Sequence, residues 1–167
     1  RAYTGDGGPA DKATYDGMHN VAVTKSGVIY ISDSWNHCIR RIDPETNVIT
    51  TIAGTGKSGF SGDGGLAQEA TFDYLMCVTL DPQEKNLYVA DLKNLRIRVV
   101  HIESGIVKTV AGNGKKGIPA DGSLAVDAPL VDPRAVEVDE QGNIYVLERS
   151  GHAVRMVDRE GKIKTII

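Results

Sequence analysis

The sequence lacks several features that would assign its class at once. No apolar run approaches the length of a membrane-spanning helix, and no signal peptide is visible. Because the chain starts at Arg1 rather than at Met, the absence of a leader says nothing about the compartment. The two cysteines, Cys38 and Cys77, have no CxxC or Cys/His metal spacing. We expect them to be free, buried thiols, with a disulfide between them as the alternative.

An excess of positive charge is also absent. The 22 acidic and 19 basic residues give a net charge of −3, so the protein has no overall positive potential that would hold a nucleic-acid backbone. There is no nucleophile–base pair, phosphate loop, basic–aromatic stripe or helical periodicity. The 167 residues suffice for one domain with a core, and the 19 glycines indicate many turns.

What the sequence does contain is an internal repeat. Tyr30, Tyr88 and Tyr145 lie 58 and 57 residues apart. A carboxylate follows each tyrosine by three residues, an arginine follows seven residues later, and an aspartate lies in a glycine-rich segment before each unit. These residues are Asp33, Asp91 and Glu148; Arg40, Arg98 and Arg155; and Asp6, Asp63 and Asp121. A fixed period of this length indicates an array of similar structural units.

Each unit has the pattern of four short strands joined by tight turns. Residues 28–32 are rich in β-branched and aromatic side chains, and glycine-containing turns separate such runs. Four antiparallel strands in such a period form one β-propeller blade. We therefore predict an all-β fold of three four-stranded antiparallel blades at about residues 5–56, 62–114 and 120–167. A solenoid is the alternative, but its coils have shorter periods and no hairpin turns.

Residues 32–42, SDSWNHCIRRI, closely resemble the signature of the NHL-repeat family. Residues 90–100 match it less fully, and residues 147–157 have diverged most. The GDGG segments resemble an insertion of bacterial members. Rings of this family commonly have six blades, so the resemblance implies half of a six-bladed propeller. It also favours a periplasmic or extracellular location, but it is weak evidence for function because one fold hosts many functions.

Departures from the repeat are the places where a site is expected. Aligning the units puts His19, Met76 and Arg134 at one position, at the start of the innermost strand and the mouth of the central channel. Metal-binding amidating lyases that resemble this family carry histidines at a matching site, and here only His19 matches. A zinc site needs about three protein ligands. A divalent metal held partly by His19 therefore stays an alternative to a structural or general channel-mouth role, and we predict no cofactor.

Trp35, Lys93 and Ser150 share the turn between the second and third strands, on the same face but further out. An exposed Trp35 would anchor a partner, and packing against a neighbouring glycine loop is the alternative. The repeated carboxylates and arginines are interpreted as partly buried pairs that join strands or blades. The GDGG aspartates are expected to cap backbone amides rather than to bind calcium.

The favoured function is a non-catalytic binding or scaffolding module, whose loop face and channel mouth meet a protein, peptide or glycan. A metal-dependent lyase or lactonase with a channel-mouth site is the first alternative, and catalytic residues are not assigned. An RNA-binding NHL domain is the second, disfavoured by the acidic balance. For the chain alone we expect a homodimer that closes the ring; otherwise further blades of the same chain would close it.

Overall fold

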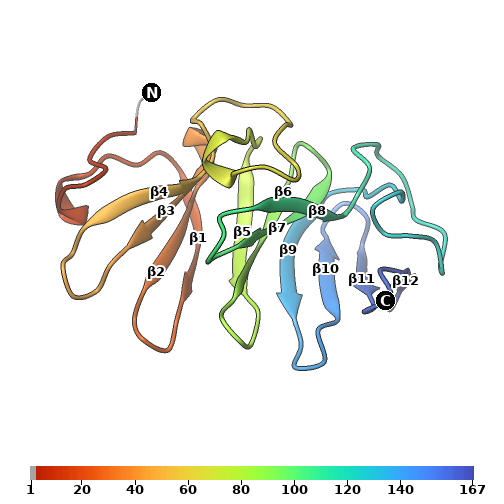
Figure 1. The fold of residues 1–167 in the computed structure, drawn as a ribbon. Helices are drawn as coiled ribbons and strands as arrows, with labels where there is room; N and C mark the ends of the chain where they lie inside the picture. Colours follow the sequence, from red (N-terminus) through yellow and green to blue (C-terminus); the bar gives the residue numbers. More distant parts are fainter. Residues whose placement is uncertain (1–2) are drawn as a thin grey trace.

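The computed structural model describes residues 3–167 and places three twisted β-sheets side by side around an arc (Figure 1). Each sheet has four antiparallel strands in sequential order, from the inner side of the arc outwards. The strands of the first sheet are β1 (Met18–Val23), β2 (Ile29–Asp33), β3 (Cys38–Ile42) and β4 (Ile49–Ala53). Those of the second sheet are β5 (Leu75–Leu80), β6 (Asn86–Asp91), β7 (Arg96–His101) and β8 (Val107–Ala111). Those of the third sheet are β9 (Pro133–Val138), β10 (Ile144–Glu148), β11 (Ala153–Val157) and β12 (Ile163–Thr165).

The prediction of an all-β fold with three four-stranded antiparallel blades is therefore confirmed. Within residues 3–167 the only helices are single 3-10 turns, and none is long and apolar enough to cross a membrane. These turns are η1 (Ala10–Lys12), η2 (Ser34–Asn36) and η3 (Ala67–Glu69).

The innermost strand of each sheet begins before its regular apolar alternation. The apolar alternation begins at Val21 and Val78, whereas β1 and β5 begin at Met18 and Leu75. In both strands the pairing register shifts within the first three residues. A bulge of this kind interrupts the alternation of side chains, so the period-two pattern becomes regular only after it.

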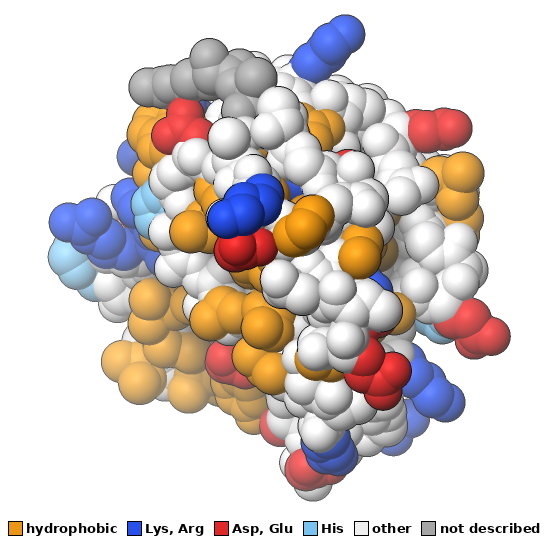
Figure 2. Space-filling model, turned by 90° about the vertical axis from the view of Figure 1, so that its left-hand side faces the viewer, with side chains coloured by type: hydrophobic (Ala, Val, Ile, Leu, Met, Phe, Trp, Pro, Cys, Tyr) orange, Lys and Arg blue, Asp and Glu red, His pale blue; other side chains and the backbone are white. Residues whose placement is uncertain are grey.

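The apolar core lies between the sheets. One cluster joins the first sheet to the second, and another joins the second to the third. Val78 and Val136, at the same repeat position, are 2% and 1% exposed because each faces the preceding sheet. Val21 takes this position in the first sheet and is 55% exposed. The face of the first sheet that carries Val21 and Val23 is called the first end face. Figure 2 shows this end of the molecule, where hydrophobic side chains cover part of the surface.

A buried arginine organises each sheet. In the second sheet the Arg98 guanidinium is fully buried and donates to Asp63 Oδ1 at 2.8 Å and to the carbonyls of Thr71 and Ser61 at 2.9 and 2.8 Å. The Asp91 carboxylate lies 3.7 Å from it. These contacts tie β7 to β6 and to the glycine-rich segment before β5. The predicted carboxylate–arginine pairs are therefore confirmed, at 3.6 Å in the first sheet and 2.8 Å in the third.

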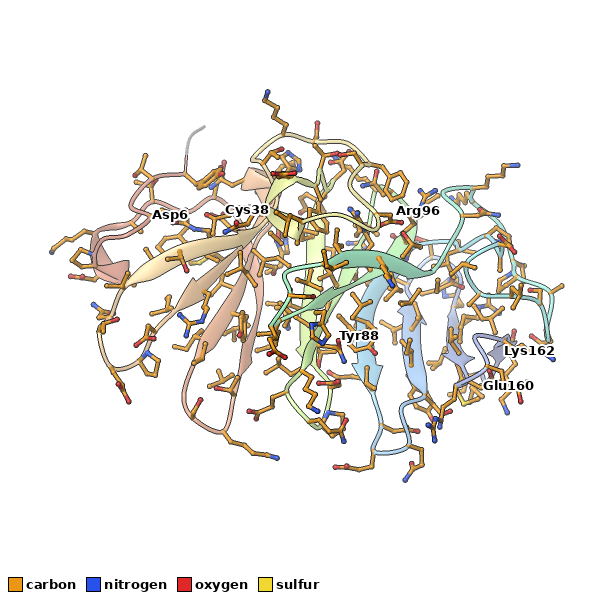
Figure 3. All side chains as sticks on the ribbon, in the orientation of Figure 1. Asp6, Cys38, Tyr88, Arg96, Glu160 and Lys162 are labelled. Carbon is orange, nitrogen blue, oxygen red and sulfur yellow. The ribbon has the colours of Figure 1, made fainter. Side chains whose placement is uncertain are left out.

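Asp6 and Asp121 of the glycine-rich segments do cap backbone amides, but those of an outer strand rather than of their own turn, whereas Asp63 accepts from the Thr109 hydroxyl of its outer strand. Thr51 N donates to Asp6 Oδ2 at 3.0 Å, and Thr165 N donates to Asp121 Oδ1 at 2.8 Å. Asp6 lies beside the first sheet, near Cys38 at the start of β3 (Figure 3). Asp6 also accepts a hydrogen bond from Arg40 at 2.8 Å, so one carboxylate serves both the arginine and the sheet edge.

Replacing Arg98 with Ala should lower the free energy of unfolding by about 3–5 kcal/mol, because Asp63 and Asp91 would lose their buried partner. Denaturant-induced unfolding measures this loss. Lys108→Ala, at an exposed position of β8 in the same sheet, is the matched control and should change stability by less than about 0.5 kcal/mol. Equal stability of the two variants would contradict the structural role of Arg98.

Both cysteines are free and buried, as expected. Burial raises the pKa of the Cys38 thiol to about 12 and also raises the pKa of Cys77. Because the thiolate is the reactive form, iodoacetamide should modify neither residue in the native protein at neutral pH and both after denaturation. Mass spectrometry of the labelled protein distinguishes the two states. Rapid labelling of Cys38 in the native protein would show that the first sheet opens readily.

Candidate functional site

The position shared by His19, Met76 and Arg134 is a β-bulge in all three sheets. In the first sheet the pairing with β2 skips from Met18 to Asn20, so His19 is the extra residue. The same irregularity leaves Met76 and Arg134 without a cross-strand partner in the other two sheets. Bulges re-aim a side chain and are common next to active sites, so the scaffold repeats while the chemistry of the side chain changes.

The three bulges and the three predicted turn residues lie at the same end of the sheets. The bulges are at the starts of β1, β5 and β9, which line the inner side of the arc (Figure 1). Trp35, Lys93 and Ser150 follow β2, β6 and β10, whose antiparallel direction returns the chain to that end. This end of the three sheets is called the bulged face.

Three of the predicted residues meet around Tyr74 at the border of the first and second sheets. The Tyr74 hydroxyl lies 3.1 Å from His19 Nε2. The Trp35 and Tyr74 rings are 4.5 Å apart between centroids and 71° between planes. Lys93 Nζ lies 5.6 Å from the Trp35 centroid and 5.5 Å from that of Tyr74. We call His19, Trp35, Tyr74 and Lys93 the aromatic cluster.

Sequence reasoning missed Tyr74 because its role depends on backbone geometry. Its φ of 62° is in the left-handed region, and Gly17 at the equivalent position of the first repeat has a φ of 63°. A side chain at Gly17 would come within 1.9 Å of Trp35 Cδ1, so glycine there lets Trp35 lie against the backbone. The exchange of this glycine for a tyrosine in the second repeat was the available signal. A non-glycine residue in this conformation is uncommon and indicates a constrained site.

Asp73, also missed, brings a carboxylate to the cluster. Its Oδ1 atom lies 3.8 Å from Lys93 Nζ and 3.5 Å from His37 Nδ1, and it is buried without a hydrogen-bond partner. His37 Nδ1 accepts a hydrogen bond from Tyr74 N at 3.3 Å, so it carries no proton to give to Asp73. Burial lowers the pKa of His37, although the Asp73 charge opposes this shift. His37 is therefore neutral at neutral pH, and the negative charge of Asp73 faces Lys93.

The other predicted residues form a separate group in the third sheet. Arg134 Nε lies 3.1 Å from Asp132 Oδ1, and Ser150 Oγ donates to Asp132 Oδ2 at 2.8 Å. Burial disfavours the Asp132 charge, but the hydrogen bonds from Ser150 and Arg134 outweigh it and lower the pKa of Asp132. Met76 instead packs against the apolar cluster between the second and third sheets. The six predicted residues thus divide into two polar groups with Met76 apart from both.

His19 has both ring nitrogens engaged. Nδ1 lies 2.6 Å from the Gly17 carbonyl, and Nε2 faces the Tyr74 hydroxyl. The carbonyl can only accept, so Nδ1 carries the proton and Nε2 accepts from Tyr74. Within residues 3–167, no group of three or more His, Cys, Asp or Glu side chains could hold a metal ion. A metal ion bound to His19 Nε2 would have to displace the Tyr74 hydroxyl, and its other ligands would have to come from outside residues 3–167.

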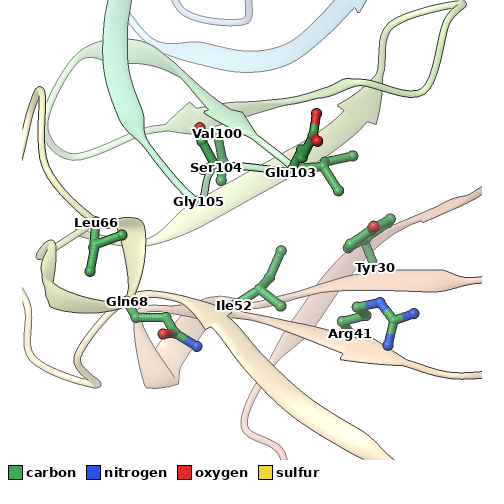
Figure 4. Close-up of a pocket in the computed structure, with 10 residues that line it drawn as sticks. Tyr30, Arg41, Ile52, Leu66, Gln68, Val100, Glu103, Ser104 and Gly105 are labelled. Carbon is green, nitrogen blue, oxygen red and sulfur yellow. The ribbon is translucent and has the colours of Figure 1, made fainter.

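A cavity of about 310 Å³ opens elsewhere, between the first and second sheets (Figure 4). Ile52, Leu66 and Val100 form its apolar walls, beside Tyr30 and Arg41. The Arg41 guanidinium is already engaged by Asp43 at 3.3 Å. None of the six site residues predicted from the sequence lines this cavity, so it is separate from the bulged face.

Comparisons with known proteins agree with this architecture. The family model for the NHL repeat matches residues 19–42, and the model for the teneurin NHL domain matches residues 104–167. NHL repeat-containing protein 2 from Homo sapiens is 30% identical over 142 residues, covering 83% of this chain and 18% of that protein. The chain spans less than a fifth of the length of the curated relatives it matches first.

Solved structures share the fold. An auxiliary nutrient binding protein from Bacteroides ovatus has a TM-score of 0.67 and 20% identity, over 91% of this chain and 36% of that one. Virginiamycin B lyase from Staphylococcus aureus has a TM-score of 0.58 and 17% identity, over 89% and 40%. At these identities the likeness concerns the fold alone. With the repeated sheets, the signature in residues 32–42 and the matching relatives, the chain belongs to the NHL-repeat family.

Proposed function

We propose that the bulged face is the ligand-binding face of an NHL propeller and that the aromatic cluster contacts a protein, peptide or glycan. One observation carries this proposal. Three consecutive inner strands bulge at the same residue, and each places a different side chain there: His19, Met76 and Arg134. A constant scaffold with variable side chains is the arrangement expected of a recognition surface on a rigid frame.

The composition of the cluster supports recognition. Trp35 is 37% exposed although it rests against Gly17 and Tyr74, so its ring is both positioned and accessible. Tryptophan and tyrosine dominate binding energy at interfaces, because they offer a large area with few rotatable bonds. Neither interpretation of Trp35 from the sequence excludes the other: it packs against a glycine and still presents a surface.

The lyase or lactonase alternative depends on metal ligands that residues 3–167 do not bring together. The fold does not decide the question, since it occurs both in a nutrient binding protein and in a lyase. Metal analysis of the purified protein separates the two functions. Binding without catalysis predicts no stoichiometric transition metal, and one metal ion per chain would favour the enzyme.

We also propose that the 167-residue chain alone pairs head to tail with a second copy to close a ring of six blades. Its first end face exposes Val21 and Val23, and the outward face of the third sheet exposes Leu147 and Ile167. In the interior of the arc, faces of these two kinds bury each other. The apolar faces at the two ends of the arc are therefore complementary, and two copies would bury both pairs of faces. In a longer chain, further blades would cover the same faces.

A ligand found on peptide or oligosaccharide arrays should lose about tenfold or more in affinity when Trp35 is replaced by Ala, because anchor aromatics contribute most of the binding energy. Isothermal titration calorimetry measures the loss. Ile118→Ala is the matched control, since Ile118 is 75% exposed and its segment pairs with the chain entering the third sheet, whereas the cluster lies at the border of the first and second sheets. A ligand that binds both variants equally well would place the binding face elsewhere.

Light scattering of the purified chain should give twice the mass of one chain. Val21→Glu should reduce this to a single chain by placing a charge in the apolar contact, whereas Lys108→Glu, at an exposed position of the middle sheet, should leave the pairing intact. A folded monomer at micromolar concentration in the unaltered protein would contradict the pairing. It would leave the binding proposal untouched, because the aromatic cluster lies within one chain.

A further inference from the structure

The aromatic cluster has the shape of a cation site that the protein fills with its own side chain. The Trp35 and Tyr74 rings meet at 71°, so they form two walls of a corner. The Lys93 ammonium lies 5.6 and 5.5 Å from the two ring centroids. Cations are attracted to the face of an aromatic ring within about 6 Å, and rings at an angle bind quaternary ammonium groups in many proteins.

A carboxylate completes the corner. Asp73 Oδ1 is buried and has no hydrogen-bond partner, and its nearest cation is Lys93 at 3.8 Å. The neighbouring imidazole of His37 does not neutralise it, because its Nδ1 accepts from the Tyr74 amide. A buried carboxylate oxygen without a donor is costly, so this atom favours any cation that enters the corner.

Lys93 occupies the corner only loosely. Its side chain is 52% exposed, its distance to Asp73 is long for an ion pair, and both ring distances are near the outer limit. An exposed lysine of this kind keeps much of its rotamer freedom, and its ammonium group readily leaves the corner for the solvent. It is therefore displaceable, whereas the rings behind it are held by Gly17 and by the left-handed backbone at Tyr74.

The corner occurs once among the described repeats. In the next repeat the position of Trp35 is taken by Lys93 itself, and in the third repeat the positions of Asp73 and Tyr74 carry Val131 and Asp132. The border between the second and third sheets therefore has neither the two rings nor this carboxylate. The arrangement is a property of one border and not of the repeat.

We propose that Trp35, Tyr74 and Asp73 form a binding site for a cationic group of the ligand, a quaternary ammonium or the ammonium or guanidinium of a side chain, and that Lys93 competes for it. The proposal rests on the binding function proposed above and names the chemistry that the bulged face recognises. In the free protein Lys93 keeps the site closed, and an incoming cation exchanges with it.

Trp35 is the only tryptophan in the chain, so its fluorescence reports on this corner alone. Tetramethylammonium chloride should change the emission saturably, beyond the change caused by potassium chloride at equal ionic strength. Tert-butyl alcohol, similar in shape but neutral, should not. Lys93→Ala should bind tetramethylammonium at least about twofold more tightly, because the competitor is gone. Lys108→Ala, an exposed lysine of the same sheet, should bind like the unaltered protein.

Asp73→Asn should weaken binding in both the unaltered and the Lys93→Ala background. Acetyl-arginine amide and acetyl-lysine amide, titrated in parallel, distinguish a partner's side chain from a quaternary ammonium ligand as the source of the cation. The absence of saturable binding in folded Lys93→Ala, or equal binding of the neutral alcohol, would overturn the cation site. An array ligand that still depends on Trp35 would then leave the binding function standing.

Discussion

A buried guanidinium in each sheet is the interaction on which the rest of the structure depends. In the second sheet, Arg98 brings together β6, β7 and the segment that precedes β5, and its donors reach carbonyl oxygens as well as carboxylates. A buried cation that loses one of its partners is strongly destabilised, so the backbone that carries these partners has little freedom to move. The turn that holds Trp35 begins directly after Asp33, which lies 3.6 Å from Arg40. The position of the aromatic cluster therefore originates in the arginine network.

The glycine-rich segments determine which surface is available for recognition. Gly64 N donates to the Val107 carbonyl and Val107 N donates to that of Gly65, so the segment covers the open edge of β8. The first and third sheets are covered in the same way. An uncovered edge would recruit an extended chain by backbone pairing. With the outer edges covered in this way, the proposed recognition is assigned to side chains at the ends of the sheets, where the bulges are.

Much of the fold was predictable because it depends on patterns that repeat. The register of Tyr30, Tyr88 and Tyr145 was enough to predict three sheets, and the recurring arginines predicted the buried pairs. The candidate site was predictable only in part. Alignment selected His19, Trp35 and Lys93, but their meeting point is Tyr74, whose left-handed backbone was marked in the sequence only by the glycine that the first repeat has at the same position. Asp73 could not be recognised either, since its importance comes from burial without a partner, which is a property of packing.

The glycine-rich segments also bear on how such a chain grows. Each one covers the outer strand of the sheet that follows it. The second and third segments also bond the end of the sheet before them: Gly54 N donates to the Ala67 carbonyl and Gly112 N to the Ala125 carbonyl, both at 2.8 Å. A unit that runs from the start of one segment to the start of the next therefore includes the segment that covers its outer strand and the aspartate that binds its arginine. It also includes the hydrogen bonds that join it to the preceding sheet. Gene duplication at that boundary adds a complete blade, whereas duplication at the first strand would add an unfinished one. The natural module of this protein thus begins in what looks like a linker.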